Sequence, residues 1–318
     1  MMERSREFDL GLDQSRIRDP RDAHRQHATA DELLRRFFDP DPAQRWEVQL
    51  LADEVGMGKT FVALATAYSI LAHLRDGKDE GDLAGCYQKV LVVTPPNSAL
   101  QRKWRREVSE FVQRCVPKEH RKDRAGWFAP AFVERLDELV IELRRRGSSP
   151  RVVVANMGVF GAKLRHYDLK RRYLLGMLFR FWGARFRGEQ RERLLRGAPP
   201  DWPRDPNSIA LFEEKEIERL PFFENEVLSA LDRLSRRTSR LEELLELCRE
   251  IAQPYVHGRD EQFVRVDRLL DKIYRRMAVQ LIRQDLPLLI VDEAHNWKNG
   301  PTTGANGFRK FAAHRAFG

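Results

Sequence analysis

Residues 51–60 read LADEVGMGKT and separate two apolar segments of different character. Residues 48–52 form a short apolar run, whereas residues 60–74 are rich in alanine and aliphatic side chains and suit a buried helix. The glycines between these segments favour a tight turn. This order predicts a strand, a glycine-rich loop and a helix.

Three further apolar runs extend the pattern, at residues 89–94 (KVLVVT), 151–155 (RVVVA) and 286–292 (LPLLIVD). Each run is continuously apolar rather than alternating. That pattern is typical of strands buried on both faces of a parallel sheet, with helices between them. We therefore predict an α/β fold in which helices flank a parallel sheet.

The runs divide the 318-residue chain into four expected parts. These are a leader with an amphipathic helix (residues 1–45), the first part of the sheet-containing core (46–160), a long helical insertion (161–285) and the return to the core (286–318). The leader helix is expected at residues 28–38, where apolar side chains recur at helical spacing.

The insertion is expected to form a helical hairpin. Apolar residues between 227 and 248 alternate at spacings of four and three, apart from the polar Thr238. A second helical pattern covers residues 266–277, beyond a break at 254–258. The apolar seam predicts the hairpin's own core; a docking surface for a partner chain is the alternative.

The glycine-rich loop carries residue types that suit a phosphate group. Its backbone N–H groups are expected to face the phosphate at Gly56, Met57 and Gly58. Lys59 would neutralise the β- and γ-phosphates of ATP, and Thr60 would hold Mg²⁺ through its hydroxyl. The common P-loop pattern has glycine where this chain has Asp53, so the motif is met in part and an ordinary tight turn is the alternative.

Two acids end the last apolar run, in the sequence VDEAHN at residues 291–296. At the carboxyl end of a parallel strand they would share a sheet edge with the glycine-rich loop. Asp292 would reach Mg²⁺, commonly through water, and Glu293 would position and deprotonate the attacking water. With Lys59 they form the predicted catalytic set of an ATP hydrolase; an ordinary strand end is the alternative.

The order DExGxGKT, TPPN and DEAHNxKN resembles the first RecA-like lobe of Swi/Snf-like ATPases of superfamily two. The resemblance covers roughly residues 26–299 without the insertion, and it implies a P-loop, RecA-like fold and a DNA-dependent ATPase that tracks duplex DNA. It places a contact with the DNA backbone at three residues, Thr94, Pro95 and Asn97.

The same resemblance assigns two further residues. Gln26 would read the adenine edge, since an amide can both donate and accept hydrogen bonds, and His295 would couple the nucleotide state to the interface between lobes. A solvated glutamine and a packed histidine are the alternatives. In this family a second RecA-like lobe supplies the arginine that stabilises the transferring phosphoryl group.

No second lobe is recognisable before Gly318. We therefore expect this chain alone to bind ATP and Mg²⁺ but to hydrolyse ATP poorly, and to need a second lobe in cis or in trans. A strand-separating helicase lobe and a nucleotide-binding interaction scaffold without turnover remain alternatives. DNA and RNA are not distinguished by these motifs.

The chain carries 57 lysines and arginines against 48 aspartates and glutamates, a net charge of +9 that favours an acidic partner. Residues 161–200 hold 11 basic and three acidic residues with interleaved aromatic residues. Arg171 and Arg172 are candidate phosphate contacts in this stretch. The alternatives are that the stretch lies on an anionic membrane, or that it buries its apolar face on the sheet and leaves the arginines in water.

The three cysteines are far apart and form no CxxC pair, so neither a zinc site nor a disulfide framework is indicated. No apolar run is long enough to span a membrane, and the first residues do not resemble a signal peptide. We expect a soluble protein of the reducing cytoplasm, with no membrane partner.

Overall fold

The computed structural model describes residues 2–17, 19–52, 58–77, 83–134, 136–145, 147, 150–160, 169–200, 202, 221–254, 258–282 and 284–293. The chain divides into two compact units. The sheet unit comprises Met1–Glu134, Glu138–Asn156 and Gln284–Asn299, and the helical unit comprises Arg135–Asp137, Met157–Arg283 and Gly300–Gly318.

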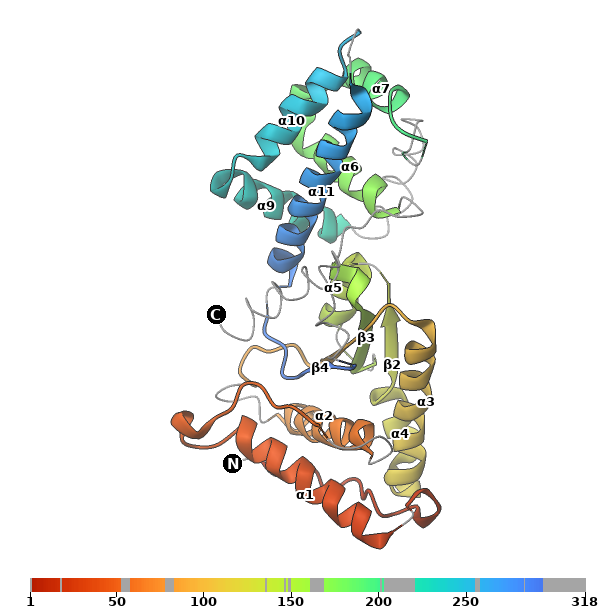
Figure 1. The fold of residues 1–318 in the computed structure, drawn as a ribbon. Coiled ribbons are helices and arrows are strands. Elements are labelled where there is room, and N and C mark those ends of the chain that lie inside the picture. Colours follow the sequence, from red (N-terminus) through yellow and green to blue (C-terminus); the bar gives the residue numbers. More distant parts are fainter. Residues whose placement is uncertain are drawn as a thin grey trace. The chain divides into compact units, whose positions relative to one another are not determined.

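A four-stranded sheet forms the centre of the sheet unit (Figure 1). The strands are β1 (Val90–Thr94), β2 (Pro130–Val133), β3 (Val152–Asn156) and β4 (Leu289–Val291). Their order is β2-β3-β1-β4, and every neighbouring pair is parallel. The predicted α/β fold with a parallel sheet is therefore confirmed.

The register of the sheet brings the carboxyl ends of three strands together. Thr94 of β1 pairs with Asn156 of β3, and Val93 pairs with Val291 of β4. The N–H group of Asp292 extends this ladder by donating to the carbonyl of Val93 at 3.0 Å. All of β1 is buried, as a strand covered on both faces requires.

Two differences from the predicted strands have physical causes. The strand predicted at residues 48–52 is wrong, since these residues form no regular structure and Leu50 is 79% exposed. An apolar run becomes a strand only where a neighbour satisfies its backbone groups, and the described sheet pairs none with it. The unpredicted β2 is a short edge strand that begins at Pro130, where the missing N–H costs no ladder bond.

Five α-helices and two short 3-10 helices belong to the described part of the sheet unit. They are η1 (Gln14–Arg16), α1 (Pro20–Phe37), η2 (Pro42–Gln44), α2 (Lys59–Arg75), α3 (Ser98–Cys115), α4 (Lys118–Trp127) and α5 (Leu136–Arg144). Asp19 caps α1 by accepting from the N–H of Arg21. α1 packs against α2, and α2 packs against α3.

Aromatic rings from several elements form the core of the sheet unit. The ring of Tyr68 on α2 lies with its centroid 5.4 Å from Phe8, 5.8 Å from Phe111 and 5.0 Å from Phe128. The Tyr68 hydroxyl donates to Glu7 at 2.8 Å. The first ten residues are thus part of the core rather than a separate extension.

The described part of the helical unit contains η4 (Met157–Phe160), α6 (Leu169–Trp182), η5 (Gly183–Arg185), α7 (Gly188–Arg196), α9 (Pro221–Arg237), α10 (Arg240–Ile251) and α11 (Arg259–Leu281). The helix predicted across residues 227–248 breaks at Thr238 and Ser239, so a single continuous helix was wrong. Its apolar seam is nevertheless buried. α11 packs against both α9 and α10.

Candidate functional site

The candidate site lies at the carboxyl edge of the sheet, where ligands of parallel α/β folds usually bind. Asp292 and Glu293 directly follow β4, and α3 begins soon after β1. The loop that leads into α2 supplies Gly58, Lys59 and Thr60 at the start of that helix. Gly56 and Met57 lie outside the described residues.

Gly58 occupies a position that only glycine fits. Its φ of 79° is in the left-handed region, and it precedes α2 without a side-chain cap. A Cβ atom at this position would lie 2.4 Å from Nε2 of Gln26 on α1. The loop backbone at Gly58 therefore lies directly against the side chain of Gln26.

Gln26 is buried, with 5% of its surface exposed, so the alternative of a solvated glutamine is wrong. Its amide reaches the end of the glycine-rich loop from a helix that begins far upstream. This placement is compatible with the predicted contact to a nucleotide base. Contact with adenine itself remains a prediction.

The carboxylate of Asp292 is held by two neutral donors. The indole Nε1–H of Trp104 on α3 donates to Oδ2 at 2.8 Å, and the backbone N–H of Glu293 donates to Oδ1 at 3.0 Å. Trp104 is almost fully buried. The sequence analysis did not assign Trp104 to the site.

Glu293 has an unusual backbone conformation. Its φ of 52° makes it the one non-glycine residue with positive φ in the described part of the chain. A left-handed conformation costs a non-glycine residue roughly 1–2 kcal/mol. Strain of this kind is concentrated at functional sites. His295, predicted to couple the site to a second lobe, lies outside the described residues.

The side chain of Thr60 interacts with Glu107, a second α3 residue that sequence analysis did not identify. Burial raises the pKa of Glu107, and the nearby charge of Lys103 and the hydrogen bond from Thr60 only partly offset this effect. Glu107 is one helical turn beyond Trp104. The only sequence signal was the three-residue spacing of Trp104 and Glu107. That spacing places them on one side of a helix but does not show what this side contacts.

The donor set suits magnesium and a phosphate group. Mg²⁺ prefers oxygen ligands and is commonly held by one or two protein groups together with water and substrate phosphates. The Thr60 hydroxyl and the Asp292 carboxylate fit that description. Within the described residues, no group of three histidine, cysteine, aspartate or glutamate side chains forms an all-protein metal site.

The residues predicted to contact DNA are only partly exposed. Thr94 and Pro95 are buried, which does not favour a contact of their side chains with a phosphate backbone; the predicted contact of this element with DNA stays a prediction. Asn97 is exposed, and its side chain caps α3 by accepting from the N–H of Ala99 at 2.8 Å. One residue of the predicted set thus remains accessible.

Arg171, in the helical unit, is also unsuited to a phosphate contact. It is 2% exposed, lies over the ring of Trp202 at 4.7 Å from the centroid, and forms an ion pair with Asp267 at 3.2 Å. The prediction for Arg171 is therefore wrong, because its charge is buried and paired. The side chain of Arg172 lies outside the described residues.

The aromatic residues of this basic stretch serve the core. Phe179, Trp182 and Phe186 are buried and pack with ring centroids 5.8–6.4 Å apart. They are not available to stack on bases, which favours burial of the apolar face; the three rings pack against one another, and no described contact joins them to the predicted sheet surface. No helix in the described residues combines the length and apolarity needed to cross a membrane.

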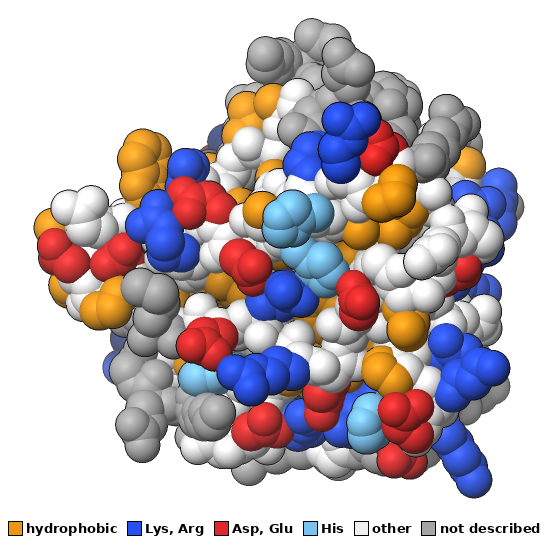
Figure 2. All heavy atoms as spheres, turned by 90° about the horizontal axis from the view of Figure 1, so that it is seen from below, with side chains coloured by type: hydrophobic (Ala, Val, Ile, Leu, Met, Phe, Trp, Pro, Cys, Tyr) orange, Lys and Arg blue, Asp and Glu red, His pale blue; other side chains and the backbone are white. Residues whose placement is uncertain are grey.

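Charges of both signs are interspersed on the face of the protein shown in Figure 2. On α1, Glu32 pairs with Arg35 and Arg36. Among the residues drawn in colour, this face shows no continuous basic patch.

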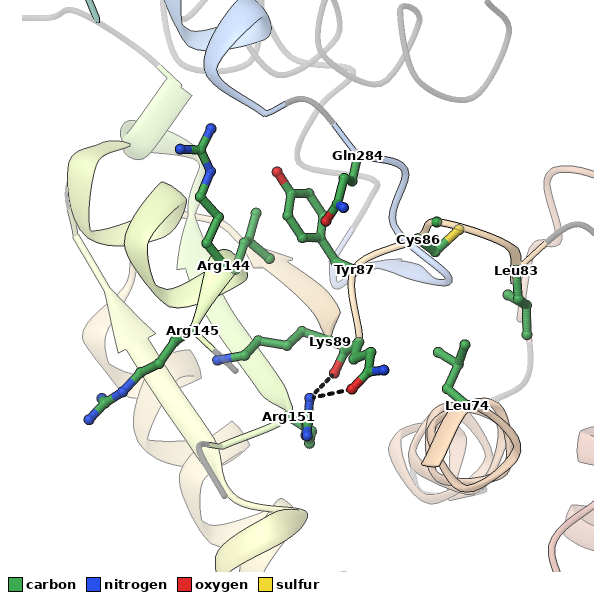
Figure 3. Close-up of a pocket in the computed structure, with 12 residues that line it drawn as sticks. Leu74, Leu83, Cys86, Tyr87, Lys89, Arg144, Arg145, Arg151 and Gln284 are labelled. Atoms are coloured by element: carbon green, nitrogen blue, oxygen red, sulfur yellow. Dashed lines mark hydrogen bonds between the residues drawn. The ribbon is translucent and has the colours of Figure 1, made fainter. Parts of the chain in front are cut away.

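A cavity of about 300 Å³ lies at the opposite, amino edge of the sheet (Figure 3). Its lining includes Lys89 and Arg151, which directly precede β1 and β3. Lys89 is buried and pairs with Glu142 at 2.6 Å, while Arg151 donates to the carbonyls of Gln88 and Gly147. No residue of the predicted ATP site lines this cavity.

Comparison with protein-family models, curated proteins and solved structures found no match for this chain. Its function must therefore be argued from the motifs and the geometry of the carboxyl edge.

Proposed function

We propose that this chain is the ATP-binding lobe of a DNA-dependent ATPase or translocase of the Swi/Snf-like superfamily-two class. A second RecA-like lobe, in cis or in trans, would complete the motor. One observation carries the proposal: Asp292, assigned to Mg²⁺ from the DEAH motif, accepts a hydrogen bond from Trp104 of α3, and Glu107 of the same helix interacts with Thr60 at the start of α2. Contact of both residues with one helix supports the proposal that they serve the same magnesium site.

The roles of the other residues follow from their positions. Lys59 is the first residue of α2, where its ammonium group and the positive end of the helix can act together on phosphate charge. Bound Mg²⁺ would neutralise charge that develops on the phosphate oxygens. Glu293 can accept a proton from a water molecule and orient that water for attack. Gln26, which lies against Gly58, would face the base.

Nucleotide binding by the full chain tests the proposal. We expect ATP with Mg²⁺ to bind, and we expect Lys59→Ala to weaken binding by about tenfold or more, since a hydrogen bond to a charged group contributes on the order of 1.5–3 kcal/mol. Isothermal titration calorimetry measures both constants. Lys118→Ala, at an exposed position on α4, is the control. Equal binding by the parent chain and Lys59→Ala would contradict the proposed site.

The DNA-dependent part of the proposal rests on the net charge of +9 and on the TPPN element, of which Asn97 is exposed. Fluorescence anisotropy with labelled duplex DNA at several salt concentrations measures this interaction. If about six phosphates are contacted, the log–log slope should be near −5. A slope near zero would remove DNA from the proposal while leaving nucleotide binding intact.

A nucleotide-binding interaction scaffold is the second candidate. The burial of Thr94, Pro95 and Arg171 favours it, because these side chains are withdrawn from nucleic acid. This candidate predicts tight ATP binding that DNA does not alter. Calorimetric titrations of ATP with and without saturating duplex DNA distinguish the two proposals.

A further inference from the structure

Residues on one face of α3 contact two segments that are distant in the sequence. Trp104 and Glu107 are three residues apart, so they lie on the same side of the helix, one turn from each other. Trp104 reaches Asp292 after β4, and Glu107 reaches Thr60 at the start of α2. The two candidate magnesium ligands are thus held from a common support.

The contact from Trp104 orients a carboxylate without neutralising it. An indole N–H is a hydrogen-bond donor only and carries no charge. It occupies Oδ2 of Asp292 from one side, while the N–H of Glu293 occupies Oδ1. A lysine or arginine in the same place would compete with a metal ion for the negative charge, whereas the indole leaves that charge in place.

The contact from Glu107 orients a hydroxyl. A threonine hydroxyl has one hydrogen to donate and two lone pairs to offer. Because a carboxylate is an acceptor, the interaction with Glu107 would direct the Thr60 hydrogen toward Glu107, so that the oxygen lone pairs could face a cation. A threonine that binds a metal through its oxygen needs this orientation.

We propose that Trp104 and Glu107 are positioning residues of the magnesium site, which hold Asp292 and Thr60 in the orientation that a Mg²⁺–nucleotide complex requires. The proposal rests on the proposed function of the site. Groups that orient metal ligands in this way typically change metal affinity by about 10- to 100-fold when they are removed.

The Glu107 contact is tested by two substitutions that differ in one property. Glu107→Leu removes the acceptor, whereas Glu107→Gln removes the charge but keeps a carbonyl oxygen that can accept from Thr60. The measurement is the Mg²⁺ concentration that gives half-maximal binding of the non-hydrolysable ATP analogue AMP-PNP. We expect Glu107→Leu to raise it about 10-fold or more and Glu107→Gln to restore most of the loss.

Glu110→Leu is the matched control. Glu110 lies on the same helix, and its ion pair with Arg106 is weak, with the two charged atoms 4.0 Å apart. We expect it to leave the Mg²⁺ requirement unchanged. If Glu107→Leu and Glu107→Gln shift the requirement equally, or if neither shifts it, the proposed role of Glu107 is overturned.

The Trp104 contact is tested by Trp104→Phe, which keeps an aromatic ring and removes the donor. We expect the Mg²⁺ requirement for AMP-PNP binding to rise about 10-fold. Phe111→Leu, at a buried position of α3 away from Asp292, controls for a general loss of packing. Thermal unfolding curves compare the stability of the two variants. An unchanged requirement in Trp104→Phe overturns its proposed role.

The parent chain and Asp292→Asn test the proposed function independently of the Trp104 and Glu107 variants. If the parent chain binds AMP-PNP with no dependence on Mg²⁺, or does not bind it, the proposed function itself fails. If the parent chain depends on Mg²⁺ and Asp292→Asn loses that dependence while Trp104→Phe and Glu107→Leu retain it, only the positioning role is overturned.

Discussion

The two edges of the sheet hold charged side chains in opposite ways. At the amino edge, the ammonium group of Lys89 is paired with the carboxylate of Glu142 at 2.6 Å. At the carboxyl edge, Asp292 accepts hydrogen bonds from neutral groups, the Trp104 indole and the Glu293 N–H. The charge at the amino edge is paired with an opposite charge, whereas the carboxylate at the carboxyl edge is held by neutral donors, as the proposed cation site would require.

Glu7 resembles Glu142 of the amino edge, because its carboxylate is also paired with basic side chains. Burial alone would raise its pKa, but hydrogen bonds from Arg75, Arg124 and Tyr68 outweigh burial and lower the pKa to about 2. A carboxylate held by two arginines has a structural role. The comparison therefore predicts that substitutions of Glu142 and Glu7 reduce stability, whereas substitutions at the carboxyl edge chiefly change ligand binding.

The largest expected effect on stability is at the amino edge. Glu142→Gln leaves Lys89 buried without its counter-charge, which should lower the free energy of unfolding by about 3 kcal/mol. Urea denaturation measures the change. The double variant Lys89→Met with Glu142→Leu should recover most of the loss, because neither charge is then buried alone. A single variant as stable as the parent would break the comparison.

The next effect concerns Glu7 and depends on pH. Because its folded pKa of about 2 lies below the usual 4.5, the stability from Glu7 is present above pH 4.5 and is lost as the pH falls toward 2. Glu7→Gln should cost about 2 kcal/mol at neutral pH, after allowance for solvent screening, and much less at about pH 3. Urea denaturation at both pH values tests this; an equal cost at both contradicts it.

A smaller effect is expected at Glu293, where the backbone is left-handed. Both Glu293→Ala and Glu293→Gly remove the carboxylate, but glycine adopts this φ without strain. Glu293→Gly should therefore be more stable than Glu293→Ala by about 1 kcal/mol. Thermal unfolding of the two variants compares them directly. Equal stability would show that the backbone at this position relaxes when the side chain is lost.

The smallest effect on stability is expected for Glu107→Gln. This variant tests whether charge at the carboxyl edge contributes less to folding than charge at the amino edge. Burial raises the pKa of Glu107. Ionisation of Glu107 therefore lowers the stability of the folded protein as the pH rises through that pKa. Replacing the carboxylate should leave the melting temperature at neutral pH unchanged or slightly higher. At acidic pH, where Glu107 is protonated, the difference should disappear. A marked loss of stability at neutral pH would place Glu107 with Glu142 as a structural charge.

The parallel sheet could be predicted because its main strands are short, continuous apolar runs. The same reasoning failed at residues 48–52, because apolar character reports a preference for burial and cannot name a pairing partner. β2 was missed because it is four residues long and begins at Pro130. The break at Thr238 was also missed, although that residue was the polar exception in an otherwise regular seam.

The candidate site was predictable only where its residues follow one another in a motif. Lys59, Thr60, Asp292 and Glu293 could be assigned in this way. Trp104 could not, since its partner lies 188 residues away and only the packing of α3 brings the two together. Charge counting likewise suggested Arg171 as a phosphate contact, because composition does not reveal a buried partner.

The attachment of Asp292 and Thr60 to one helix has a mechanical consequence. A helix is stiff over a single turn, so Trp104 and Glu107 cannot shift independently of each other. The helix begins at the exposed cap Asn97, about two turns before Trp104. A displacement of that end of α3 would therefore move the contacts to the Thr60 hydroxyl and to the Asp292 carboxylate at the same time.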